Sequence, residues 1–247
     1  MLMSMLTACG NKDVADDTKD NNVSTTEANQ ATVDTKDNSD APTADADQAA
    51  ADEVAALIDA IYVQARTEET DAQCEAAKAA WDALTDAQKA LVEGEEASPD
   101  YFGLDTGDAS KDDPRNQDEI GEKELLVVSF GTSFNDSRVA DIKSIEDALQ
   151  EANPDWSVRR AFTAQIIINH VQARDDEKID NMQQALDRAV ANGVKNLVVQ
   201  PTHLMHGAEY DEMNELLDRY KDKFEGIAVA EPLLGDCLLY TSPSPRD

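Results

Sequence analysis

The sequence predicts an α/β fold for residues 124–236: a doubly wound parallel sheet, preceded by a disordered tether and a small helical segment. Three observations favour this architecture. Short runs of Val, Leu and Ile are typical of strands that are buried on both faces of a parallel sheet. Segments with helical periodicity separate these runs, which gives the alternation of strand and helix that a parallel sheet requires. Residues 11–50, by contrast, contain no Leu, Ile, Met, Phe, Tyr or Trp.

The first nine residues resemble the end of a bacterial lipoprotein signal. Leu6, Thr7 and Ala8 precede Cys9 as in a lipobox, although the charged region and most of the apolar region of a signal peptide are missing. We therefore expect a lipid on Cys9 and a location outside the cytoplasmic membrane. If the Ala-Cys pair is a coincidence, the expected location is the cytoplasm. No stretch of about 20 apolar residues is present, so a lipid anchor is the only membrane attachment that we expect.

Three further segments precede the α/β part. Residues 10–50 are expected to form a disordered acidic linker, because they cannot bury enough apolar surface to offset their conformational entropy. Residues 51–93 carry apolar residues at helical spacing and a capping box from Thr85 to Gln88, which predicts a small helical module. Residues 94–123 are again acidic and are predicted to be a second linker. The net charge of -31 argues against nucleic acid as a partner.

From Glu124 onwards, strands and helices are expected to alternate. The predicted strands cover 125–130, 156–162, 194–200 and 227–230, and the predicted helices follow Asp136 or Ser137 and cover 164–173, 179–192 and 209–223. Gly193 is expected to end the third of these helices in a left-handed conformation. Residues 237–247 fit nothing before them and look like the translation of a sequencing adapter, so we leave them out of the functional argument.

Polar residues that could carry chemistry follow the predicted strands. In open α/β sheets, ligands bind beyond the carboxyl ends of the strands. His203 and His206 follow the third strand and Glu231 follows the fourth. A neutral imidazole at position 203 could bind a divalent metal or accept a proton, or it could simply hydrogen-bond within its loop. Glu231 could complete a metal site that faces His203, or it could point into solvent.

Nucleotide chemistry is disfavoured by the loop after the first strand. Gly131 would allow a ligand to approach the backbone closely. However, the loop has neither the glycine-rich dinucleotide fingerprint nor a phosphate-binding Gly-Lys-Ser/Thr motif.

Three ordered blocks carry a resemblance to a known family. They cover residues 125–138 (LLVVSFGTSFNDSR), 158–169 (VRRAFTAQIIIN) and 197–210 (LVVQPTHLMHGAEY). Together they closely resemble the anaerobic sirohydrochlorin cobaltochelatases, and the resemblance extends over nearly all of 124–236.

The resemblance implies a class II chelatase with two similar α/β halves, of which residues 124–236 are the first. Such enzymes insert Co²⁺ into the tetrapyrrole sirohydrochlorin without ATP, in anaerobic cobalamin biosynthesis. His203 then corresponds to a catalytic histidine and metal ligand, and Glu231 to a glutamate ligand. The implied substrate-binding residues are Ser129, Gly131, Thr132, Ser133, Arg138 and His206.

The resemblance also sets the expected partners. Co²⁺ is the substrate metal, with Ni²⁺ or Fe²⁺ possible, and no tightly bound cofactor is expected. A homo-oligomer is possible. Arginines and Lys195 could attract the carboxylates of the tetrapyrrole or could form ordinary ion pairs.

Two functions fit these observations. The first is an anchored chelatase of the lyase type, although the chain as given is expected to be inactive because half of the cleft is absent. The second is an extracytoplasmic lipoprotein that binds a tetrapyrrole or a metal for haem or cobalt uptake and keeps the chelatase fold.

Overall fold

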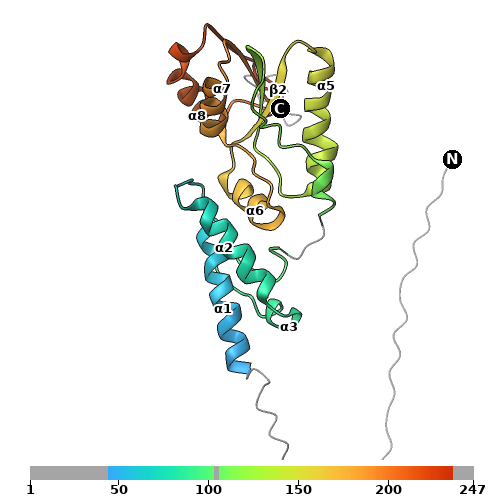
Figure 1. Cartoon of the computed structure of the whole chain (residues 1–247), viewed down its shortest axis with the longest axis vertical. Coiled ribbons are helices and arrows are strands. Elements are labelled where there is room, and N and C mark those ends of the chain that lie inside the picture. The colour runs from blue at the N-terminus through green and yellow to red at the C-terminus, as the bar shows by residue number, and fades with distance from the viewer. Residues whose placement is uncertain (1–43, 103–105, 236–247) are drawn as a thin grey trace, which may run out of the picture. The chain divides into compact units, whose positions relative to one another are not determined.

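The computed structural model of the chain describes residues 44–102 and 106–235 (Figure 1). The expected lipidation site at Cys9, most of the tether at 10–50 and the tail at 237–247 lie outside the described residues. Within them, four strands are β1 (Lys123–Ser129), β2 (Ser157–Phe162), β3 (Asn196–Pro201) and β4 (Gly226–Val229). The helices of eight or more residues are α1 (Ala44–Ile61), α2 (Thr70–Ala83), α5 (Ser144–Ala152), α6 (Gln165–Asp175), α7 (Met182–Ala191) and α8 (Ala208–Asp218).

The four strands form one parallel sheet in the order β2-β1-β3-β4. β1 lies inside the sheet, with Leu125 paired to Val158 on one side and to Val198 on the other. Its residues 124–129 are all buried, as its continuous apolar run predicts. The predicted α/β fold is therefore confirmed.

Successive side chains of β1 supply two different cores, one on each face of the sheet. Leu126 and Val128 pack in a large core with α7 and α8, to which α8 contributes Met213 and Leu217. Leu125 and Val127 pack on the opposite face, in a smaller core that includes residues of α5 and β2. Figure 1 shows α5 on one side of the sheet and α7 and α8 on the other.

The helical stretch between β1 and β2 differs from its predicted pattern. It runs through α4 (Asn135–Ser137), a π-helical turn at Arg138–Lys143 and α5. Apolar residues at helical spacing in this stretch predict that Ile145 faces the core, but Ile145 is exposed and Glu146 is buried. The physical reason is an ion pair: both carboxylate oxygens of Glu146 accept hydrogen bonds from Arg160 at 2.8 Å.

The helical module begins earlier than expected, because α1 starts at Ala44 and not near residue 51. α1 and α2 share a core with Trp81 and Val92, and the capping box of Thr85 and Gln88 opens the short helix α3 (Asp86–Lys89) as predicted. This core also contains Ala173 of α6, so it is continuous with the α/β part. Among the described helices, none has the length and apolar character needed to cross a bilayer.

The segment expected to be an acidic linker, 94–123, is packed along much of its length. Tyr101 and Phe102 are buried in the core of the helical module, and a 3-10 turn follows at Ala109–Lys111. The carboxylate of Asp112 is fully buried beside Arg138 and Arg160. The prediction of a solvated linker is therefore wrong for Tyr101, Phe102 and Asp112, because their side chains are buried against other parts of the chain.

Candidate functional site

All four strands are parallel, so the loops that follow them meet at one edge of the sheet. This edge is where ligands bind in open α/β folds. Hydrogen bonds join the loops: Thr163 N–H donates to the carbonyl of Ser129 at 2.9 Å, and Thr202 N–H donates to the carbonyl of Val128 at 2.9 Å. The sequence-predicted residues at positions 129–133, 203–206 and 231 therefore all lie on loops of one connected edge.

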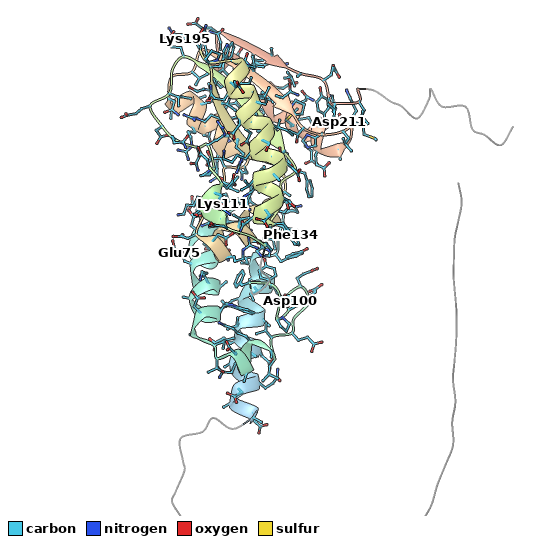
Figure 2. All side chains as sticks on the ribbon, turned by 90° about the vertical axis from the view of Figure 1, so that its right-hand side faces the viewer. Glu75, Asp100, Lys111, Phe134, Lys195 and Asp211 are labelled. Atoms are coloured by element: carbon cyan, nitrogen blue, oxygen red, sulfur yellow. The ribbon has the colours of Figure 1, made fainter. Side chains whose placement is uncertain are left out.

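The loop after β1 is held by its own polar groups. The Ser129 hydroxyl is buried and accepts a hydrogen bond from Thr202 at 2.9 Å. The Thr132 hydroxyl accepts from Phe134 N–H at 3.1 Å, and the carbonyl of Ser133 accepts from Arg174 at 2.6 Å. Figure 2 labels the exposed ring of Phe134 on this loop. These contacts define the loop conformation, and its predicted contact with substrate remains a prediction.

Gly131 is required for the shape of this loop. Its φ is +104°, and a Cβ there would lie 2.5 Å from the ring of Phe162. No side chain fits without moving the ring, since atoms in real structures do not approach so closely. The glycine therefore brings the backbone against β2, and its role in the fold is established by this contact.

Arg138, which was predicted to bind substrate, serves the fold instead. Its side chain is fully buried and its guanidinium bonds to Asp112 at 2.6 Å and to Glu177 at 2.7 Å. Arg160 is buried in the same cluster, and Lys195 pairs with Glu122 at the opposite end of β3 from the candidate site. The ion-pair alternative thus holds for these three cations, and we correct the prediction for Arg138.

The loop after β3 is fixed to the loop after β4. Leu233 N–H donates to the carbonyl of His203 at 3.0 Å, and Leu234 N–H donates to the carbonyl of Leu204 at 2.8 Å. The backbone that carries His203 is therefore held on one side by β3 and on the other by the 233–234 segment.

The imidazole of His203 has two available nitrogen atoms. Both Nδ1 and Nε2 are shielded from solvent and make no hydrogen bond within the described part of the chain. Burial lowers the pKa of His203 below its ordinary value, against the opposing effect of the Glu209 charge. The ring is thus kept neutral near pH 7, and a neutral ring can donate a lone pair to a metal or accept a proton.

Glu231 pairs with His206. Its Oε2 lies 2.8 Å from Nε2 of His206, whose side chain is 34% exposed while that of Glu231 is 73% exposed. The His206 ring also contacts Tyr210 at 4.5 Å between centroids. The structure therefore brings together the two residues that the sequence analysis had kept apart, the expected metal-ligand glutamate and the second histidine.

No group of three His, Cys, Asp or Glu side chains is arranged to hold a metal ion within residues 44–102 and 106–235. The edge offers instead one neutral imidazole with free nitrogens and one imidazole–carboxylate pair. Such groups can accept protons and supply single ligands to a passing ion, but they do not form a complete resident metal site.

His170 has a packing role. It stacks on Tyr101 with 4.2 Å between the ring centroids. Burial lowers its pKa to about 4. It therefore belongs to the contact between α6 and the preceding segment.

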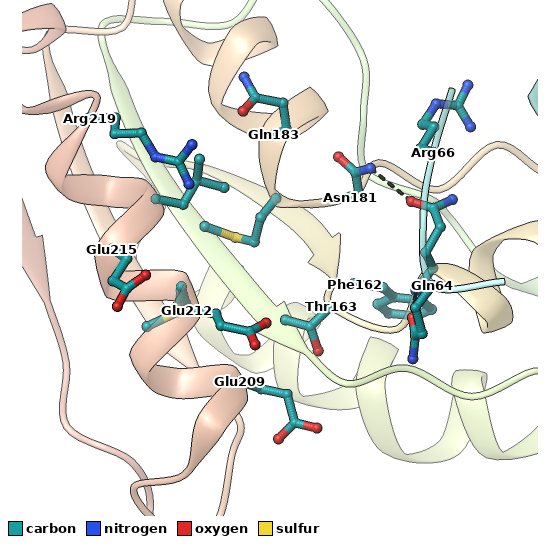
Figure 3. A pocket seen from close by; sticks show the side chains of 14 residues that line it. Gln64, Arg66, Phe162, Thr163, Asn181, Gln183, Glu209, Glu212, Glu215 and Arg219 are labelled. Carbon is teal, nitrogen blue, oxygen red and sulfur yellow. Dashed lines mark hydrogen bonds between the residues drawn. The ribbon is translucent and has the colours of Figure 1, made fainter. Parts of the chain in front are cut away.

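A cavity of about 410 Å³ lies at the same edge of the sheet (Figure 3). Phe162 and Thr163 at the end of β2 line it, together with residues of α7 and α8. Gln64 and Arg66, which connect α1 to α2, line it as well. Sequence reasoning missed these two residues because no motif marks them and because the helical module was expected to be separate.

Comparisons with known proteins give a family match and two similar relatives. Residues 123–243 match the family model described as cobalt chelatase (CbiK), and this match extends into the tail that was set apart as adapter-derived. The sirohydrochlorin cobaltochelatase of Salmonella typhimurium is 35% identical over 113 residues, which are 46% of this chain and 43% of that protein. Sirohydrochlorin cobaltochelatase CbiKC of Nitratidesulfovibrio vulgaris is 28% identical over 123 residues, 49% of this chain and 43% of that protein. The chain thus spans less than half the length of these relatives.

Proposed function

Because residues 123–243 match the cobalt chelatase (CbiK) family model, we propose that the chain belongs to this family and forms one half of a sirohydrochlorin cobaltochelatase. It would insert Co²⁺ into sirohydrochlorin without ATP, in anaerobic cobalamin biosynthesis. One observation at the sheet edge supports the assignment of a site: both ring nitrogens of His203 lack a hydrogen-bond partner among the described residues, on a backbone that is fixed by hydrogen bonds. Burial lowers the pKa of this imidazole, which favours its neutral form.

The reaction needs a base and a metal carrier. Two pyrrole N–H protons leave the macrocycle, Co²⁺ takes their place on the ring nitrogens, and the charges balance. A neutral His203 can accept one of these protons or hold Co²⁺ while the ring distorts. Co²⁺ enters here as a substrate and leaves in the product.

His206 and Glu231 supply a second acceptor. A carboxylate that bonds one nitrogen of an imidazole orients the ring and favours its charged form. The His206–Glu231 pair, 2.8 Å apart, can thus take up a proton at the mouth of the site or guide an arriving cation toward His203.

A second candidate function is a tetrapyrrole- or metal-binding lipoprotein outside the cytoplasmic membrane. The lipobox-like residues before Cys9 motivate this candidate. Both candidates place the protein on a lipid anchor at Cys9. Cys9→Ser should abolish the incorporation of labelled palmitate that the wild type shows. Equal labelling of the wild type and the variant would exclude the anchor.

The experiment is an anaerobic titration of the chain with sirohydrochlorin and Co²⁺, without ATP. We expect absorbance changes for binding of each substrate and, where insertion occurs, the spectrum of the cobalt product. His203→Ala should remove the nitrogen ligand from the Co²⁺ spectrum and should slow any insertion by roughly 100-fold, the usual contribution of a positioned base.

Met205→Ala is the matched control, because it shortens an exposed side chain of the same loop without removing a nitrogen. It should leave the Co²⁺ spectrum unchanged. If neither substrate binds to the chain, the proposed function is wrong. If both bind equally well to the His203→Ala variant, the function survives and the role of His203 is wrong. Binding of both substrates without insertion, in a protein that also carries the second half, would favour the second candidate.

A further inference from the structure

The cavity at the sheet edge has one wall that comes from outside the family-matched segment. Gln64 and Arg66 lie in the helical module, before residue 123 where the match begins. In Figure 3 they lie on the side of the cavity opposite α8, with Phe162 and Thr163 between the two sides, and the guanidinium of Arg66 extends away from α8. The family segment alone would lack this wall.

Both residues of this wall are held in place by hydrogen bonds. Gln64 Oε1 accepts from the N–H of Gln165, the first residue of α6, at 2.8 Å. Arg66 donates through Nη2 to Asp71 at 2.7 Å. These bonds leave the side-chain amide of Gln64 and most N–H groups of Arg66 available, since a guanidinium carries five donors.

The opposite wall limits what the cavity can accept. Glu209, Glu212 and Glu215 reach it from α8, so an anionic group is repelled on that side. A carboxylate is favoured near the two cations of the lining, Arg66 on the module side and Arg219 just after α8. Phe162 and Met213 add apolar surface between the two ends.

We propose that Arg66 and Gln64 are substrate-positioning residues that bind a peripheral carboxylate of the tetrapyrrole, so that the helical module helps to select the substrate. The inference rests on the proposed function and adds to it a wall that the family segment does not contain. The volume of about 410 Å³ lies in the range of small-molecule sites, roughly 300–1,000 Å³, and suits one edge of a macrocycle with its carboxylate arms.

The test measures binding of metal-free porphyrins to the full chain by fluorescence. The anionic probe is uroporphyrin, which has a carboxylate on every peripheral side chain, and the cationic probe is a porphyrin with pyridinium side chains. Arg66→Ala should weaken uroporphyrin binding about tenfold, which corresponds to the loss of one charge-assisted bond. It should not weaken binding of the cationic probe.

Two control variants separate binding from structure. Lys78→Ala removes one positive charge from α2 away from this cavity and should change neither affinity. Asp71→Asn breaks the ion pair of Arg66 but keeps the guanidinium, so uroporphyrin binding should stay equal or become tighter. A weaker affinity in Asp71→Asn, like that in Arg66→Ala, would show that the ion pair acts through folding and would overturn the proposal.

The outcomes also separate this inference from the proposed function. Uroporphyrin binding that depends on Arg66 supports the inference whether or not the chain inserts cobalt. Cobalt insertion with uroporphyrin affinity in Arg66→Ala within twofold of the wild type overturns the inference and keeps the function. Failure of the wild-type chain to bind uroporphyrin overturns the inference as well.

Discussion

Replacement of Asp112 by Ala should destabilise the protein more than replacement of any exposed acid in the same segment. Its Oδ2 lies 2.6 Å from Nε of Arg138 and 2.6 Å from Nη1 of Arg160, and its Oδ1 lies 2.9 Å from Nη2 of Arg160. All three side chains are fully buried. Burial alone would raise the pKa of Asp112, but the two arginines outweigh burial and hold that pKa below its ordinary value.

The size of the effect follows from what the change leaves behind. Arg160 keeps Glu146 and Arg138 keeps Glu177, so neither guanidinium becomes wholly unpaired. Three charge-assisted hydrogen bonds are nevertheless lost in a buried place. Breaking a buried ion pair typically costs about 3–5 kcal/mol of unfolding free energy, and we expect Asp112→Ala to fall in that range.

Urea unfolding followed by tryptophan fluorescence measures this cost. Trp81 lies in the core of the helical module and Trp156 beside the sheet, so the two rings report on both parts of the described chain. The control is Asp108→Ala, an exposed acid of the same segment that caps the turn at 109–111. It should cost much less than Asp112→Ala. Equal, small losses in both variants would mean that Asp112 is solvated and that the segment is a linker after all.

Two further predictions concern stability. Burial, aided by the charge of Arg174, lowers the pKa of His170 to about 4, so the native state resists its protonation. The stability that neutral His170 contributes is fully present above the unfolded pKa of about 6.5. As the pH falls toward 4, about 3 kcal/mol of the unfolding free energy is lost. Burial raises the pKa of Glu124 to about 7, which has the opposite effect on stability in much of this range. We therefore compare the wild type with His170→Phe in urea titrations from pH 7 to 4. The wild type should lose more unfolding free energy than the variant over this range, and parallel pH profiles would contradict this prediction. Gly131→Ala should cost about 2–4 kcal/mol, because its Cβ meets Phe162 and its φ is positive. Gly193→Ala, also at positive φ but with nothing within 4 Å, should cost only about 1 kcal/mol, and similar midpoints of thermal unfolding for the two variants would refute the clash.

Regular periodicity made the sheet predictable. The apolar run of β1 is buried on both faces, and the glycine at 193 ends α7 with φ +74° as expected. Such features depend on neighbours in the sequence, and their signals are local. The same logic located the loops at the carboxyl edge, because parallel strands place their ends together.

Side-chain partners at long range could not be predicted in this way. Asp112 meets Arg160 across 48 positions, and His206 meets Glu231 across 25. The acidic segment contains glycine and proline and therefore has the composition of a linker. That composition is the same whether or not one of its carboxylates pairs with a buried cation. The pairing of His206 with Glu231 is equally invisible, because only the fold decides which imidazole of the loop turns toward the fourth strand.

The polar residues of α6 did contain evidence in the sequence that another part of the chain covers this helix. Gln165, Asn169 and Gln172 are buried, although a surface helix would expose them. Asn169 donates to the carbonyl of Ile61 at 2.9 Å, and Gln172 donates to Asp71 at 2.7 Å. A family segment without residues 44–102 would lose these acceptors and the cap on Gln165 N–H, and it would expose the α6 surface that the module covers in this chain. The module therefore supplies the hydrogen-bond partners of the polar face of α6. The same contacts fix the segment that carries Arg66.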